Sequence, residues 1–96
     1  MLSLIKTMFT VYILYSSVHH KKYIGYTTDL IQRFYSHNKL ATKGYTIKYR
    51  PWVVIHTEIF ESKEMASARE KSLKSGKGRE WIKDSIIPQY RAIGFI

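Results

Sequence analysis

Four side chains in the first half of the chain carry the acid, base and cationic groups needed to act on a phosphate ester. Tyr12 and Tyr23 lie in two strand-like segments, and Arg33 and His37 are four residues apart in a segment with helical spacing, so the last two share one helix face. An arginine can bind a phosphodiester through two parallel hydrogen bonds, and a histidine can exchange a proton near neutral pH. A phenol can donate a hydrogen bond or, once deprotonated, activate water. If the strand register places Tyr12 and Tyr23 on one sheet face, the four groups would form a phosphate-binding site.

Each of these residues also has a structural interpretation that the sequence leaves open. Strand tyrosines usually pack in the core or at a sheet edge, and this chain has eight tyrosines. An arginine on a helix is usually solvated, and a histidine near a helix end often binds the last carbonyl groups. The deciding observation is whether the side chains converge on one open concave surface.

A second group of candidates combines positive charge with tyrosine. Residues 39–50 contain four basic side chains and two tyrosines without clean periodicity, which predicts an exposed loop. Basic side chains can follow a phosphate backbone while aromatic rings stack on splayed bases, although a plain solvated loop is the alternative. The predicted nucleic-acid contacts are Lys39, Lys43, Tyr45, Lys48 and Arg50, and the same argument extends to Lys74, Lys77, Arg79 and Lys83.

The elements that must position the first group are a hairpin and a helix. Residues 9–15 are β-branched or aromatic almost throughout, which predicts a central strand buried on both faces, and residues 22–26 predict its antiparallel partner. We expect Gly25 to end this second strand as a turn, as a bulge or at a point where another group approaches the backbone closely. The cluster Thr27, Thr28 and Asp29 predicts the N-cap of a helix that runs to about Asn38.

The second half of the chain predicts one more strand and two more helices. In a strand over residues 52–60, regular alternation would place His56 and Glu58 on the same face as Trp52, Val54 and Phe60. Residues 62–75 predict a helix capped by Ser62 and stopped by Gly76 and Gly78, and residues 79–86 predict a helix ended by Pro88. The order β-β-α-loop-β-α-α predicts an α+β fold.

The composition limits the classes of protein and of site. Ninety-six residues predict a single domain spanning 1–96, with its core at about 9–84. The net charge of +9 favours a polyanionic partner, although solubility is the simpler explanation. The absence of cysteine excludes disulfides, thiolate metal sites and a cysteine nucleophile. Lys6 and Thr7 interrupt the apolar start of the chain, so we expect no export signal and no membrane span, and a cytoplasmic location. Met8 is an alternative initiator to Met1.

Several of these pieces together resemble the GIY-YIG endonuclease family. The tripeptides Val11-Tyr12-Ile13 and Tyr23-Ile24-Gly25, ten residues apart, resemble its two name-giving motifs. The run from Tyr26 to Asn38 supplies a Thr, Leu, Arg and His similar to those of the family's first helix, and Ala66, Arg69, Glu70 and Lys71 resemble the segment that holds its metal-binding glutamate. The resemblance covers about two thirds of the chain and is nearest to small freestanding bacterial members related to the N-terminal nuclease domain of the UvrC-type excinuclease. It implies a three-stranded antiparallel sheet flanked by about three α-helices.

The resemblance also implies a role for each matching residue. Tyr12 and Tyr23 would activate and position the attacking water, with either as the base, and Arg33 would hold the scissile phosphate. His37 would assist proton transfer or orient Tyr12. Glu70 would bind one Mg²⁺ or Mn²⁺ ion, whereas the residue-based alternative is an ion pair with Lys74 four residues on.

The implied function is metal-dependent hydrolysis of DNA phosphodiester bonds, with a structure-selective role in repair or recombination as an analogy. The partner would be DNA, branched or single-stranded, with RNA not excluded and with specificity supplied by a protein partner. Many family members have an asparagine beyond the glutamate, and this chain has none after Lys71. A weak or inactive nucleic-acid-binding module of the same fold is therefore an alternative, and an RNA-directed enzyme is another.

Overall fold

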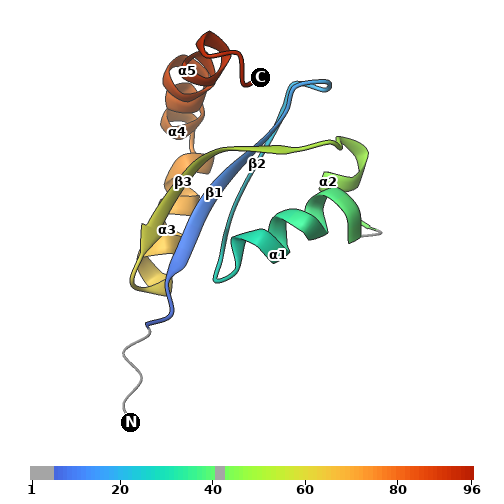
Figure 1. Cartoon of the computed structure of the whole chain (residues 1–96). Coiled ribbons are helices and arrows are strands. Elements are labelled where there is room, and N and C mark those ends of the chain that lie inside the picture. Colours follow the sequence, from blue (N-terminus) through green and yellow to red (C-terminus); the bar gives the residue numbers. More distant parts are fainter. Residues whose placement is uncertain (1–5, 41–42) are drawn as a thin grey trace.

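The computed structural model describes residues 6–40 and 43–96, and at its centre these residues form a sheet of three antiparallel strands (Figure 1). The strands are β1 (Phe9–Ser16), β2 (Lys21–Thr27) and β3 (Val53–Phe60), in the order β2-β1-β3. Every residue from Val11 to Ser16 is buried, because helices cover both faces of the central strand. The predicted central strand and antiparallel hairpin are confirmed.

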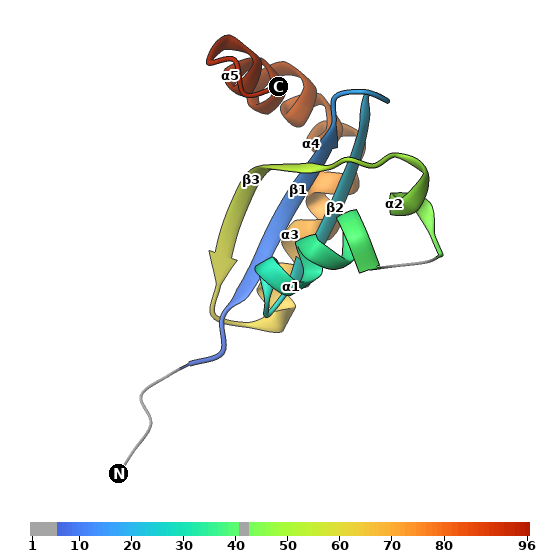
Figure 2. The same cartoon turned by 45° about the vertical axis from the view of Figure 1, so that its right-hand side comes forward.

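Helices lie on both faces of this sheet (Figure 2). One face carries α1 (Leu30–Tyr35), the π-helical segment η1 (Ser36–Leu40) that continues it, and α2 (Tyr45–Lys48). The other face carries α3 (Lys63–Lys74), α4 (Gly76–Trp81), the π-helical segment η2 (Ile82–Ile86) and α5 (Ile87–Ala92). Two apolar clusters follow from this arrangement: Tyr12, Leu14 and Trp52 pack on the α1 face, and the larger cluster around Ile13, Ile55 and Leu73 packs on the α3 face. The α+β class and the three-stranded sheet are confirmed.

The predicted helix boundaries are right for α3 and wrong after it. Ser62 caps α3 by accepting a hydrogen bond from the Met65 N–H at 3.2 Å. Gly76 and Gly78 do not form a loop, because Ser75 caps a new helical run that continues from Gly76 to Ala92. Pro88 lies in the first turn of α5, where backbone N–H groups have no hydrogen-bond acceptor within the helix. Its missing N–H is therefore tolerated, and Pro88 does not end the helical run.

A β-bulge in β3 overturns the predicted faces of that strand. Ile13 pairs with His56, whereas the next residue, Leu14, pairs with Val54, so Ile55 is an extra residue with no partner in the register. The extra residue shifts the alternation of side chains by one position. Trp52 and Val54 therefore pack on the α1 face, whereas the residues after the bulge, His56, Glu58 and Phe60, are opposite β1 residues of the α3 face.

Two more local predictions need correction. Gly25 does not end β2, which runs on to Thr27, and the predicted loop over residues 39–50 contains the end of η1 and the short helix α2. Met1 and the pair Ala41 and Thr42 lie outside the described residues. Among the described residues, the helices are all too short or too polar to cross a membrane.

Candidate active site

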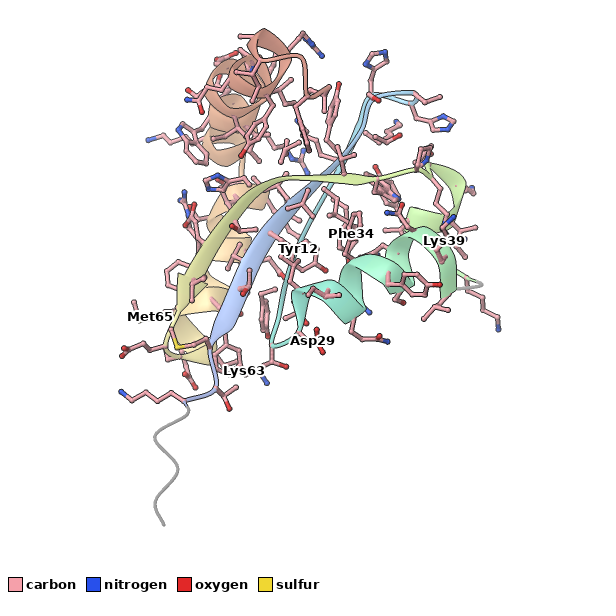
Figure 3. All side chains as sticks on the ribbon, viewed as in Figure 1. Tyr12, Asp29, Phe34, Lys39, Lys63 and Met65 are labelled. Carbon is pink, nitrogen blue, oxygen red and sulfur yellow. The ribbon has the colours of Figure 1, made fainter. Side chains whose placement is uncertain are left out.

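The register of the hairpin places both motif tyrosines on the α1 face of the sheet. Tyr12 is opposite Gly25, and Tyr23 is opposite Leu14, two residues further along β1. The two rings stack with their centroids 6.3 Å apart and their planes at 29°. Tyr12 is only 1% exposed and lies between the sheet and α1, beside Phe34 (Figure 3), whereas Tyr23 is half-buried. The condition for a shared site is met for these two residues.

Gly25 is the residue that makes room for the Tyr12 hydroxyl. A Cβ atom at Gly25 would lie 2.6 Å from that hydroxyl and 2.8 Å from the ring carbon that carries it. The Tyr12 ring therefore lies directly across the backbone of β2, with its hydroxyl on this edge strand. Of the alternatives for Gly25, close approach of another group to the backbone is the one observed.

His37 is brought against Tyr12 by the π-helical segment η1. The Tyr12 hydroxyl oxygen and His37 Nε2 form a hydrogen bond of 3.0 Å, and the imidazole lies 4.6 Å from the Tyr23 ring between centroids. Burial, followed by the positive charges of Arg33 and Arg50, lowers the pKa of His37 to about 4. The imidazole is therefore neutral at pH 7 and has one nitrogen lone pair able to accept a proton.

The chain segment that carries His37 is held from two sides. Arg50 donates hydrogen bonds to the His37 carbonyl at 2.6 Å and to the Ser36 carbonyl at 3.3 Å. Asn38 exchanges two side-chain hydrogen bonds with the backbone of Trp52, at 2.7 and 3.0 Å. These contacts fix η1 against the start of β3, and they engage the Arg50 guanidinium with the protein interior.

Arg33 reaches the two tyrosines from the exposed side of α1. Its interaction with the Tyr12 hydroxyl is the largest cause of a raised Arg33 pKa, and its interaction with the Tyr23 hydroxyl acts in the same direction. Burial raises the pKa of Tyr12, while the interaction with Arg33 acts in the opposite direction. Asp29 fixes the start of this helix by accepting a hydrogen bond from the Gln32 N–H at 3.1 Å. Arg33 therefore places a positive charge in the cavity wall, on a helix whose start is fixed by Asp29.

Glu70 lies on α3, on the other face of the sheet, and α3 contacts both β1 and the edge strand β2. Its negative charge is the smallest of the causes that shift the pKa of Tyr12, and it acts to raise it. Glu70 also forms an ion pair with Lys74 at 3.3 Å, which is the alternative that the sequence offered for this residue.

The donor set around Glu70 fits a hard divalent ion with an incomplete protein shell. Residues 6–40 and 43–96 contain no group of three His, Asp or Glu side chains able to hold an ion by themselves. A single carboxylate with a 19% exposed side chain suits Mg²⁺ or Mn²⁺, because these ions keep several waters and take further oxygens from a substrate phosphate. It does not suit a closed zinc site, which needs four protein ligands.

Two neighbouring cavities open beside these residues. The smaller, of about 190 Å³, is lined by Tyr23, Arg33, His37, Lys43 and Tyr45 among others, and we name it the Arg33 cavity. The larger, of about 460 Å³, includes Lys22, Tyr23, Tyr45, Lys74 and Arg79 in its wall, and we name it the Lys22 cavity. Three predicted catalytic residues, Tyr23, Arg33 and His37, therefore line one concave surface. Tyr12 is buried behind this surface and is connected to it by its hydrogen bond to His37, and Glu70 lines neither cavity.

The predicted nucleic-acid contacts fall into three groups. Lys43, Tyr45, Lys74 and Arg79 line one or both cavities. Lys39, Lys48, Lys77 and Lys83 are exposed outside the cavity walls, and Arg50 is occupied by backbone carbonyls. Lys22 was missed, although the pair Lys21-Lys22 directly before Tyr23 was a usable sign of positive charge beside the second motif.

Comparisons with known proteins identify the family. Residues 8–83 match the family model described as the GIY-YIG catalytic domain. A UPF0213 protein of Staphylococcus haemolyticus is 36% identical over 61 residues, which cover 64% of this chain and 74% of that protein. UPF0213 proteins of Streptococcus pyogenes are 40% identical over 57 residues, 59% of this chain, and the chain spans only 62% of their length. The solution NMR structure of the UPF0213 protein of Bacillus halodurans is 30% identical and covers 80% of this chain and 83% of its own, with a TM-score of 0.49. The chain therefore belongs to the GIY-YIG family of nuclease domains.

Proposed function

We propose that this protein is a divalent-metal-dependent endonuclease that hydrolyses phosphodiester bonds in DNA. The observation that carries the proposal is the 3.0 Å hydrogen bond between the Tyr12 hydroxyl and His37 Nε2, behind a cavity that His37, Arg33 and Tyr23 line. The charges of Arg33 and Glu70 both act on the pKa of this phenol. A proton acceptor, a phosphate-binding cation and two phenols are thus gathered at one open cavity.

The Arg33 cavity would hold the scissile phosphate. Arg33 would bind two of its oxygens and stabilise the charge that develops during attack, while Tyr23 in the cavity wall would orient the attacking water. As the water oxygen bonds to phosphorus and the bond from phosphorus to the leaving oxygen breaks, a water proton would pass to the Tyr12 oxygen and the Tyr12 proton to His37 Nε2. The neutral state of His37, whose pKa is lowered to about 4, leaves that nitrogen free to accept the proton in one tautomer.

Glu70 is the residue we assign to metal binding. When bound, a Mg²⁺ or Mn²⁺ ion would supply charge stabilisation for the leaving oxygen. For Glu70 to bind a metal ion, its 3.3 Å ion pair with Lys74 must break. An exposed ion pair four residues apart on a helix contributes only about 0.3–0.5 kcal/mol, so it is a weak competitor for the carboxylate.

Two parts of the proposal are supported by analogy within the family. They are the choice of DNA as substrate and the preference for branched, nicked or single-stranded DNA in repair or recombination. A binding module without turnover is the second candidate. Two observations favour it: Lys74 occupies the Glu70 carboxylate, and the chain has no asparagine after Lys71. An RNA substrate is the third candidate, and parallel assays on RNA and DNA oligonucleotides separate it from the first.

The decisive experiment compares the wild-type protein with Glu70→Gln on supercoiled plasmid and on a branched oligonucleotide, with Mg²⁺ or Mn²⁺. We expect Glu70→Gln to slow cleavage by about 100-fold or more, the scale of loss when a group that stabilises the transition state is removed, with unchanged DNA affinity. Glu64→Gln is the matched control, because Glu64 is an exposed carboxylate on the same helix. Absence of cleavage with either metal would favour the binding module, and full activity of Glu70→Gln would refute the metal assignment.

The two tyrosines are distinguished by the same assay. Tyr12→Phe removes the hydroxyl bonded to His37, and Tyr23→Phe removes the one in the cavity wall. A larger loss in Tyr12→Phe supports the proton path proposed above. A larger loss in Tyr23→Phe would assign water activation to Tyr23, and retained activity in both would remove the tyrosines from the mechanism.

A further inference from the structure

The Lys22 cavity lies on the edge of the sheet and neighbours the Arg33 cavity. Its volume is about 460 Å³, and its wall combines residues of β2, the outer strand, with residues of α3 and α4. Tyr23 and Tyr45 line both cavities. The Tyr45 hydroxyl donates a hydrogen bond to the Lys22 carbonyl at 3.4 Å, which links α2 to β2 at the boundary between the cavities. The two cavities are therefore adjacent, and the same two aromatic rings line both.

The charge of this cavity is positive without a carboxylate in its lining. Lys22 comes from β2, Lys74 from α3 and Arg79 from α4, and the described residues of the wall include no Asp or Glu. Lys74 is shared with Glu70, whereas the ion pairs formed among the described residues leave Lys22 and Arg79 without an acidic partner. Burial is the largest cause that lowers the pKa of Lys22, and repulsion by the charges of Arg79 and Lys83 lowers it further. An anion between them would relieve this repulsion.

We propose that Lys22, Lys74 and Arg79 bind a second phosphate of the nucleic-acid strand, the one next to the phosphate held by Arg33. The assignment rests on the proposed nuclease function, because that function places a phosphate in the Arg33 cavity. A strand carries one phosphate for about every 3.4 Å of rise, so a strand that spans two adjoining cavities must place another phosphate in the second one. The site would fix the register of the strand relative to the cleaved bond, without reading its sequence.

The test uses a variant that removes two cations of the cavity and leaves Lys74 in place. Lys22→Met with Arg79→Met is made in Glu70→Gln protein, and binding of a fluorescein-labelled single strand of about ten nucleotides is followed by anisotropy with EDTA, at several salt concentrations. We expect about tenfold weaker binding and a slope of log K against log salt reduced by about 0.7 for the lost phosphate contact. Lys63→Met with Lys71→Met is the control, because both lysines are exposed on α3, line a separate hollow and carry the same total charge.

A second measurement locates the phosphate. In the protein with Glu70 intact, an oligonucleotide with one neutral methylphosphonate beside the cleaved bond should be cut about tenfold more slowly than the unmodified strand, the scale of one lost charge-assisted contact. In Lys22→Met with Arg79→Met the same modification should have little further effect. Equal slowing in both proteins would overturn the assignment.

The outcomes separate this inference from the nuclease proposal. Because the anisotropy measurement needs neither metal nor cleavage, a specific loss of binding in Lys22→Met with Arg79→Met supports the second phosphate site even if no substrate is cut. Active cleavage together with equal binding by this variant and by the control would overturn the second site alone. An equal loss of binding to vesicles that contain phosphatidylserine would show a general anion-binding surface and would also overturn it.

Discussion

Gly25→Ala adds one methyl group at the point where the Tyr12 hydroxyl lies on β2. The new Cβ atom would be 2.6 Å from that hydroxyl, and ordinary van der Waals contact begins at 3.4 Å, a difference of 0.8 Å. The alanine itself is not strained, because Gly25 does not have a positive φ. The substitution therefore perturbs the position of the Tyr12 side chain and leaves the backbone conformation acceptable.

Tyr12 has little freedom to absorb this displacement. The residue is 1% exposed and packs with Leu14 and Trp52, and its hydroxyl is bonded to His37 at 3.0 Å. Overpacking of this kind costs about 1–3 kcal/mol of stability. A misplacement near 1 Å in an active site can slow a reaction by about 100-fold, so we expect cleavage to fall by about that factor.

The assay is nicking of supercoiled plasmid, paired with urea denaturation to measure the free energy of unfolding. Gly76→Ala is the matched control, because a Cβ atom there would meet no atom within 4 Å and the residue has no positive φ. We expect the control to keep the activity of the wild type. The lost activity of Gly25→Ala should not return at low temperature, where the folded fraction is complete.

Wild-type activity in Gly25→Ala would refute the reasoning, since the hydroxyl would then tolerate displacement and could not be the reacting or orienting group. Equal losses in Gly25→Ala and Gly76→Ala would also refute it, because the effect would not depend on contact with Tyr12.

Two further predictions concern stability. Because the folded protein holds His37 neutral down to about pH 4 while the unfolded chain protonates it near its ordinary pKa of 6.5, unfolding takes up a proton between these values. The free energy of unfolding should therefore fall by at most about 3 kcal/mol as the pH falls from about 6.5 to 4. In urea titrations, His37→Gln should lose this part of the pH dependence. Parallel curves of unfolding free energy against pH for the two proteins would contradict this prediction. Arg50→Met should lower the free energy of unfolding by about 1–3 kcal/mol, because it leaves the carbonyls of Ser36 and His37 without their donor. The control Lys48→Met, at an exposed position, should change the free energy of unfolding by less than about 0.5 kcal/mol. Similar changes in the two variants would mean that the Arg50 hydrogen bonds do not stabilise the fold.

The sequence determined those features that depend on neighbouring residues. The apolar run from Phe9 to Tyr15 specified the central strand, because β-branched and aromatic side chains suit a pleated surface packed on both faces. Asp29 and Ser62 marked the starts of α1 and α3, because a side-chain oxygen at the N-cap satisfies backbone N–H groups that the helix leaves free. The spacing of Tyr12, Tyr23, Arg33 and His37 nominated them as one group, and it left the packing role of each residue open.

Contacts between distant segments decided the rest. The bulge at Ile55 moved His56 and Glu58 to the opposite face, and the helical run continued through Pro88, both against strictly local expectations. The Lys22 cavity exists only because β2, α3 and α4 meet at one edge. A local pattern indicates which residues suit a strand or a helix. Burial and register depend on pairs of residues far apart in the chain, so only the tertiary structure could bring His37 against Tyr12 and place Lys22 in a cavity wall.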